Sequence, residues 1–238
     1  MESNWQLNQS LTPNNPSLGY SNFDIRHRII GSIGFKKSWS PKHTTYISTV
    51  IAAQSGTPFT WGFLNSTIAN TPQAAGLAYI FKDEAEATKY LVDYKDVAGN
   101  TVTSTTQAKQ FMDFVNDDDY LNTRKGNFTE RNTGRTLWNT TVDLRLMHDI
   151  NLAVAKKKTY TIQITWDVFN FTNLLNAEWG RVYFVTNTFN ATSSLGLSRI
   201  NSGTASDPTY KFVAPTQTFL IDQLASRFQS QLGLRYSF

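Results

Sequence analysis

The clearest pattern in the chain is an alternation of apolar and polar residues over its last fifteen or so positions. One phase of this alternation contains Phe228, Leu232, Leu234, Tyr236 and Phe238. The other phase contains only Gln, Gly, Arg and Ser residues. A period of two places all the apolar side chains on one face of a β-strand. The pattern predicts a strand over residues 224–238 that ends on an aromatic residue.

A second alternation predicts a strand over residues 138–152. Its apolar phase runs from Trp138 to Leu152 and includes His148, which suits that phase only near a membrane interface. Its polar phase includes Asp143, Arg145 and Asp149, which suit a water-filled lumen where charges stay hydrated.

The alternation resumes over residues 159–170, after a short basic connection that contains Lys156, Lys157 and Lys158. Its apolar phase starts at Tyr160 and includes Trp166, and its polar phase includes Gln163 and Asp167. Because only a few residues separate the two alternating segments, they predict a β-hairpin.

Two further strands are predicted near the beginning of the chain. Residues 25–38 alternate with an apolar phase at Ile29, Ile33 and Phe35, and a turn follows around Pro41. Residues 44–54 are the expected partner, although neither phase of that segment is clearly the apolar one.

The remaining connections are very unequal in length. Residues 57–137 exceed the roughly 12–15 residues usual for a loop, so we expect them to carry structure of their own. Residues 82–94 and 108–120 have helix-like composition, residues 100–106 are turn-like or strand-like, and residues 173–218 form a third, polar loop. Short turns on one side and long extracellular loops on the other are typical of outer-membrane barrels.

Composition supports an all-β class, because 13% of the residues are aromatic, only 17% are charged, and Asn, Thr and Ser are abundant. Without any cysteine the chain has neither disulfides nor thiolate metal sites. The net charge of +4 is modest and dispersed, which argues against nucleic acid as a partner.

Hydropathy gives no sign of a membrane-spanning helix or of a signal peptide in this sequence. No stretch reaches the roughly 18–20 apolar residues of a spanning helix, and the first residues are too polar for a signal peptide. Hydropathy misses barrels, however, because outward and inward residues alternate. We therefore expect the true N-terminus of the protein to lie outside this sequence.

Five strands cannot close a transmembrane barrel, for which roughly eight is the minimum. An open sheet in lipid would leave two edges of unsatisfied backbone groups. The predicted fold is therefore all-β: residues 1–238 form a transmembrane antiparallel β-barrel segment, about five strands of a larger barrel, with long extracellular loops.

Several segments in this order resemble the C-terminal strands of TonB-dependent receptors of Bacteroidetes, particularly the Oar-like group. They are Phe23–Arg28, Gln54–Phe59, Arg131–Arg135 before Trp138, Asp167–Asn176 followed by Trp179–Arg181, and Leu232–Phe238.

The resemblance implies a barrel of about 22 strands around an N-terminal plug, and the plug has no counterpart in this chain. It implies energised uptake of a substrate across the outer membrane. The implied partners are the remainder of the barrel and its plug, TonB, the barrel-assembly machinery and the lipid bilayer. A surface lipoprotein or other subunits of an outer-membrane complex are further expected partners.

Three groups of residues are candidates for function. Phe228, Leu232, Leu234, Tyr236 and Phe238 resemble the signal read by the barrel-assembly machinery, the alternative being an ordinary terminal strand. Trp39, Trp138, Tyr160 and Trp166 are candidates for membrane-interface aromatics, the alternative being core packing. Asp143, Arg145, Asp149, Gln163 and Asp167 are the candidate lumen-facing residues.

Catalytic and cofactor sites have little support. Asp117–Asp119 lacks the spacing of a calcium loop, which favours a solvated loop or the end of a short helix. None of the three histidines belongs to a serine or metal motif, and nucleotide-binding glycine loops are missing. The sequence therefore predicts neither an enzyme nor a bound cofactor or metal.

The substrate stays open among iron chelates, glycans, peptides and proteins. Two other functions also stay open. One is a structural or docking barrel subunit of an outer-membrane secretion or adhesion complex. The other is a soluble, secreted β-sandwich that binds carbohydrate through exposed tryptophans.

Overall fold

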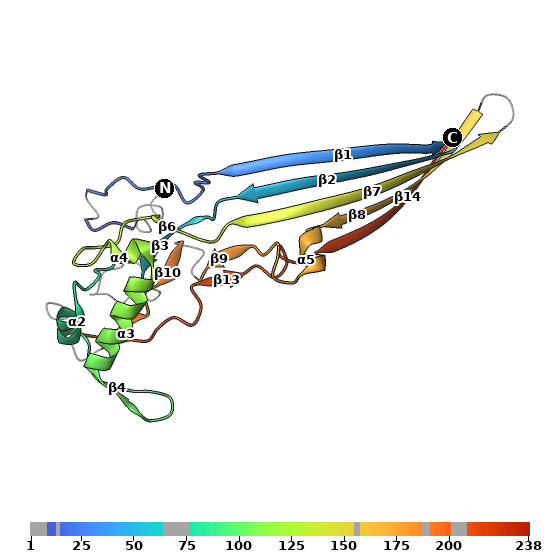
Figure 1. Cartoon of the computed structure of the whole chain (residues 1–238). Helices are drawn as coiled ribbons and strands as arrows, with labels where there is room; N and C mark the ends of the chain where they lie inside the picture. The colour runs from blue at the N-terminus through green and yellow to red at the C-terminus, as the bar shows by residue number, and fades with distance from the viewer. Residues whose placement is uncertain (1–8, 13–14, 64–76, 155–157, 187–190, 201–208) are drawn as a thin grey trace. The chain divides into compact units, whose positions relative to one another are not determined.

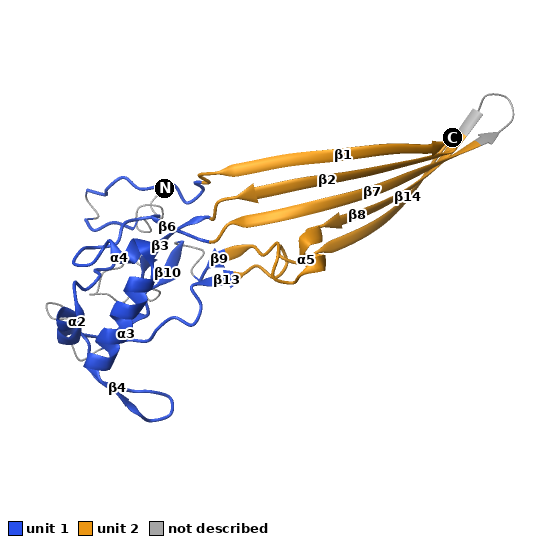
Figure 2. Ribbon diagram, viewed as in Figure 1, with its two compact units in different colours: residues 1–24, 57–136, 184–220 blue, residues 25–56, 137–183, 221–238 orange. Residues whose placement is uncertain are grey.

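The computed structural model describes residues 9–12, 15–63, 77–154, 158–186, 191–200 and 209–238. It is mostly β, with 46% of the residues in strands and 15% in helices. Among these residues no helix combines the length and apolar character needed to cross a membrane. The chain divides into two compact units, of which unit 1 comprises residues 1–24, 57–136 and 184–220, and unit 2 comprises residues 25–56, 137–183 and 221–238 (Figure 2).

Unit 2 is built on one antiparallel sheet of five long strands, which lie side by side in the order β1-β2-β7-β8-β14 (Figure 1). These strands are β1 (Arg28–Ser40), β2 (His43–Gln54), β7 (Asn139–Val154), β8 (Lys158–Phe169) and β14 (Gln229–Ser237). They lie in the five segments that were predicted to be strands, four from their alternation and β2 as the expected partner of β1. The strands are not closed into a barrel.

The register of the sheet brings the apolar phases of neighbouring strands together. Leu146 of β7 lies opposite Trp166 of β8, which in turn lies opposite Leu232 of β14. Directly opposed residues of antiparallel strands point to the same face. The apolar phases of these three strands therefore form one continuous face.

The same register resolves the ambiguity of β2. Ile47 lies opposite Leu146 of β7 on one side and Phe35 of β1 on the other, and Ile51 lies opposite Val142. The apolar phase of β2 is thus the one that contains Ile47 and Ile51. Its threonines made this phase hard to recognise from sequence alone.

Strand β14 begins at Gln229, later than the expected start at residue 224. The preceding residues instead form a turn, because the Asp222 carboxylate accepts hydrogen bonds from the backbone N–H groups of Leu224 (3.0 Å) and Ala225 (2.9 Å). A short aspartate side chain competes in this way with strand pairing.

Unit 1 contains the structure that the long connections carry. Its helices are α2 (Glu84–Tyr90), α3 (Ser104–Asp117) and α4 (Asp119–Asn122). Its strands are β3 (Pro58–Gly62), β4 (Tyr94–Lys95), β5 (Thr101–Val102), β6 (Gly134–Arg135), β10 (Thr192–Ser194), β11 (Leu197–Ile200) and β12 (Thr209–Phe212). Strands β9 (Tyr183–Val185) and β13 (Phe219–Ile221) lie at the division between the units, and helix α5 (Phe171–Leu175) belongs to unit 2.

The helices of unit 1 lie close to the segments that the composition indicates, but α3 begins at Ser104, so residues 104–106 of the expected turn-like or strand-like segment are helical. Side chains cap the N-termini of all three helices. Asp83 accepts a hydrogen bond from the backbone N–H of Glu86 at 2.8 Å, Thr103 caps α3, and Asp118 caps α4. Such caps satisfy N–H groups that have no partner within the helix. Asp118 is therefore the end of a short helix, one of the two interpretations of the Asp117–Asp119 run.

A core of its own holds unit 1 together. Phe111 of α3 is fully buried and contacts Phe81 and Phe212 edge to face, at ring-centroid distances of 5.2 and 5.3 Å. Phe212 belongs to residues 184–220, whereas the other two belong to residues 57–136. The two long connections thus fold together around a shared apolar core. Aromatic side chains bury much surface, so their contacts contribute strongly to holding the two connections together.

Candidate functional site: the two faces of the five-stranded sheet

One face of the sheet, called here the apolar face, consists of the apolar phases of the five strands. Many of its large side chains are exposed: Ile33 and Leu232 keep 72% and 77% of their surface accessible. The cost of leaving apolar area in water is about 25 cal/mol per Å². A contiguous exposed patch of this kind marks a surface that contacts something other than water.

Aromatic residues border the apolar face at its short-turn end. The rings of Tyr160 and Tyr236 stack with centroids 5.9 Å apart, and Phe238 lies 5.8 Å from Tyr236. Trp39, beside the turn between β1 and β2, donates its indole N–H to Thr45 Oγ1 at 2.9 Å. Tyrosine and tryptophan combine an apolar ring with a polar O–H or N–H group, so they suit a boundary between an apolar and a polar environment.

The opposite end of the apolar face also carries aromatic rings. Trp138 precedes β7, and its ring is parallel to that of His27, with centroids 6.3 Å apart. The backbone of His27 pairs with Ser55, which places His27 one step beyond β1 in the same register. Both ends of the apolar face are therefore bordered by side chains that combine an aromatic ring with a polar atom.

The length of the apolar face between these borders can be estimated from strand geometry. At about 3.3 Å per residue, the stretch from Trp138 to Leu152, the residue opposite Tyr160, is about 46 Å long. Tilted by about 40°, as barrel strands are, it would cover about 35 Å along the barrel axis. The apolar band of outer-membrane barrels is about 25 Å tall, so strands of this length exceed it and place their end residues at its borders.

Trp166 differs from the other three predicted interface aromatics. It lies in the same row as Ile47, Leu146 and Leu232, away from the strand ends. Its indole N–H donates to Ser230 Oγ at 2.8 Å. This hydrogen bond satisfies the polar atom of Trp166 within the apolar face itself.

The other face, called here the polar face, carries paired polar side chains. Arg145 and Asp167 are direct opposites on β7 and β8 and form an ion pair of 2.8 Å between Nε and Oδ1. Gln163 donates to the Asp149 carboxylate at 2.8 Å. Asp143 accepts the backbone N–H of Asn170 at 2.8 Å. All five predicted lumen-facing residues share this one face.

Asn170 organises the end of β8, a role that sequence reasoning missed. Its side-chain amide donates to the carbonyl oxygens of Gly180 (2.9 Å) and Ser226 (2.8 Å). Its backbone is left-handed, with φ of 52°, which asparagine tolerates better than most residues. Gly180 is also left-handed, and a Cβ on it would lie 1.9 Å from Asn170 Oδ1. The motif Asp167–Asn176 with Trp179–Arg181 thus encodes a local turn.

The next turn of the chain is held by Asn173 in a similar way. Its side-chain amide donates to the carbonyl oxygens of Ala177 (3.2 Å) and Trp179 (3.0 Å), and its oxygen accepts the backbone N–H of Phe228 at 3.2 Å. Through these contacts the segment that leaves β8 is fixed to the segment that enters β14.

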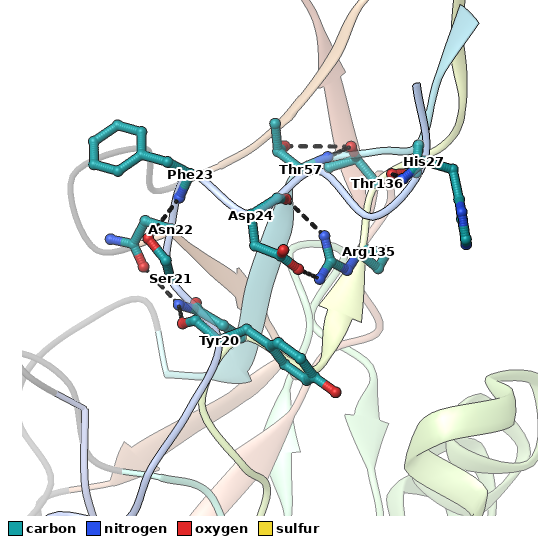
Figure 3. A network of polar contacts seen from close by, with 11 residues as sticks. Tyr20, Ser21, Asn22, Phe23, Asp24, His27, Thr57, Arg135 and Thr136 are labelled. Atoms are coloured by element: carbon teal, nitrogen blue, oxygen red, sulfur yellow. Dashed lines mark hydrogen bonds and ion pairs between the residues drawn. The ribbon is translucent and has the colours of Figure 1, made fainter. Parts of the chain in front are cut away.

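Three segments of the family resemblance meet in a polar network in unit 1 (Figure 3). Arg135 forms an ion pair with the Asp24 carboxylate and donates to the Asp24 carbonyl oxygen at 2.8 Å. The Arg135 guanidinium also lies 5.6 Å from the centre of the Tyr20 ring. The backbone N–H of Thr57 donates to Thr136 Oγ1 at 3.0 Å. These contacts give Asp24, Thr57 and Arg135 a structural role.

Within the part of the chain that the structure describes, no three His, Asp or Glu side chains form a group able to hold a metal ion. Lys156 and Lys157 of the basic connection lie outside the described residues. The five-stranded sheet itself presents two contrasting surfaces, the apolar face and the polar face.

No protein-family model, no curated protein and no solved structure matches this chain.

Proposed function

We propose that unit 2 is part of the wall of an outer-membrane β-barrel, with the apolar face against lipid and the polar face toward the lumen. The observation that carries this proposal is the exposed apolar face, bordered by aromatic residues at both ends and backed by a face of paired polar residues. In a soluble β-sandwich the apolar face of the sheet is covered by a second sheet. Ile33 and Leu232 are largely uncovered among the described residues.

The edges of the sheet extend the proposal to a larger barrel. In the described part of the chain, β1 and β14 each pair with one neighbour. In a lipid bilayer every backbone N–H and C=O group must find a partner within the protein. Further strands would therefore pair with β1 and β14. The barrel-assembly machinery would recognise β14, with the apolar residues from Phe228 to Phe238, by strand addition.

The biological role proposed for this barrel is that of a TonB-dependent receptor, which takes up a substrate with energy supplied through TonB. The support is the resemblance of five ordered segments together with the polar face, which suits a water-filled lumen. The connections that form unit 1 all leave the strand ends opposite the short turns. On this proposal they are extracellular and take part in substrate capture.

The lipid contact can be tested with single cysteines, because the natural chain has none. Ile47 and Ser48 are neighbours on β2 whose side chains point to opposite faces. A fluorophore on Ile47→Cys should be quenched by lipids with brominated acyl chains, whereas one on Ser48→Cys should not. Membranes that contain the assembled protein are the sample for both variants.

Equal quenching at the two positions would overturn the proposed orientation. Quenching of the Ser48→Cys label alone would reverse it. Iodide in the buffer serves as the matched control, since a label in a wet lumen stays within its reach.

A docking or structural role in a secretion or adhesion complex is the second candidate. The separate core of unit 1 favours it, because a compact unit with its own core suits protein contacts. Purification of the complex from outer membranes distinguishes the two roles. A plug-bearing segment in the complex supports the receptor, and stable partner proteins without any plug support the docking subunit.

A further inference from the structure

Two of the three histidines lie side by side on the apolar face, near the turn between β1 and β2. His43 starts β2, and His148 lies on the neighbouring strand β7, diagonally across the register. Nδ1 of His43 and Nε2 of His148 are 3.2 Å apart, and the ring centroids are 5.5 Å apart. His43 is exposed and His148 is half-buried.

The separation of these nitrogens fits a shared metal ion. Zinc binds imidazole nitrogens at about 2.0–2.1 Å in a tetrahedral arrangement, which puts two ligand nitrogens about 3.3 Å apart. The two nitrogens are hydrogen-bonded to each other at 3.2 Å, which lies close to this value. A tetrahedral ion can therefore take the place of the shared hydrogen with little movement of either ring.

Thr45 holds the ring nitrogen of His148 that is remote from His43. Nδ1 of His148 lies 2.9 Å from Thr45 Oγ1, which also accepts the indole N–H of Trp39 at 2.9 Å. The hydroxyl can donate to Nδ1 or accept from it, so the contact suits either tautomer of His148. In the tautomer with the proton on Nδ1, the lone pair is on Nε2, beside His43. Metal-binding histidines are typically oriented by such a hydrogen bond to the other ring nitrogen.

We propose that His43 and His148 form a zinc site, in which Thr45 orients His148. The described residues supply no third acidic or histidine ligand beside this pair. Water or an anionic oxygen, such as a phosphate, completes the coordination from the exposed side of His43. The bound ion is therefore exchangeable and bound less tightly than a four-ligand structural zinc.

Titration of zinc into the assembled protein, purified from membranes in detergent and followed by calorimetry, tests the site. We expect one equivalent to bind to the natural protein and no saturable binding to His43→Ala or His148→Ala. Thr45→Val should weaken binding by about 10- to 100-fold, as loss of an orienting hydrogen bond does. His27→Ala is the matched control and should bind as the natural protein does, because His27 stacks on Trp138 instead.

His43 is exposed beside a turn, so His43→Ala should fold, and circular dichroism checks this. Absence of binding by the natural protein would overturn the proposal. So would binding that survives in His43→Ala or disappears in His27→Ala.

Discussion

Asparagine side chains, together with the Asp143 carboxylate, fix the chain where it leaves the sheet. Only 5% of the surface of Asn170 is exposed, and both of its amide hydrogens are donated to backbone carbonyls. Its left-handed backbone turns the chain from β8 toward α5. A buried donor that binds two separate segments stabilises both, because leaving either carbonyl unpaired costs free energy.

Asn170→Ala should lower the free energy of unfolding by about 2–4 kcal/mol, from two lost hydrogen bonds and the strain of a left-handed alanine. Urea unfolding of the protein in detergent measures the change. Asn170→Gly is the matched control, because it loses the hydrogen bonds but not the backbone freedom. It should be destabilised by about 1 kcal/mol less than the alanine variant. If both variants had the same free energy of unfolding as the natural protein, this role of Asn170 would be refuted.

At the scale of elements, helix α3 joins the two long connections through Gln107. This side chain is fully buried and donates to the carbonyl oxygens of Val92 (2.9 Å) and Val102 (3.2 Å). Its oxygen accepts the backbone N–H of Phe212 in β12 at 2.9 Å. The helix is thus connected by hydrogen bonds to segments before and far after it in the sequence.

Gln107→Leu should destabilise unit 1 by about 2–4 kcal/mol, because it leaves one buried and two partly buried backbone groups without this partner. Gln110→Leu on the same helix is the control, since Gln110 is exposed and its replacement should change stability by less than about 0.5 kcal/mol. Limited proteolysis within residues 77–136 reports on unit 1 separately from the sheet. Similar cleavage rates in both variants would contradict the prediction.

At the scale of the whole molecule, the exposed apolar face predicts where the protein is found. We expect it to stay with outer membranes through salt and alkaline washes and to dissolve only in detergent. The reason is that exposing the apolar face to water costs free energy. Fractionation followed by immunoblotting measures this. A chain that remains in the aqueous fraction without detergent would instead support the secreted sandwich.

The strands were the most predictable part of the structure. In β7, β8 and β14 apolar residues on one face alternate with polar residues on the other. This alternation was enough to find both the strand and its apolar phase. In β2 the threonines fit either face, and only the pairing with Leu146 and Val142 distinguished the two. Helix composition likewise located α2 and α3, because capping and propensity are local properties.

Contacts between distant segments were not predictable. The His43–His148 pair spans 105 positions, and Asn170 binds Ser226, 56 positions away. Nothing in the local sequence around either residue specifies such a partner. The ion pair of Arg145 and Asp167 was an exception in part, since the hairpin pattern already put both residues on one face.

Local sequence was sufficient to locate five long strands, the face to which each side chain of four of them points, and the approximate places of the main helices. These are properties of periodicity and local propensity, which neighbouring residues encode. The tertiary structure alone decided the apolar phase of β2, the shared core of the two long connections and the partners of Asn170, Gln107 and His148. Those depend on which remote segments pair, and that choice is made by packing and register over the whole chain.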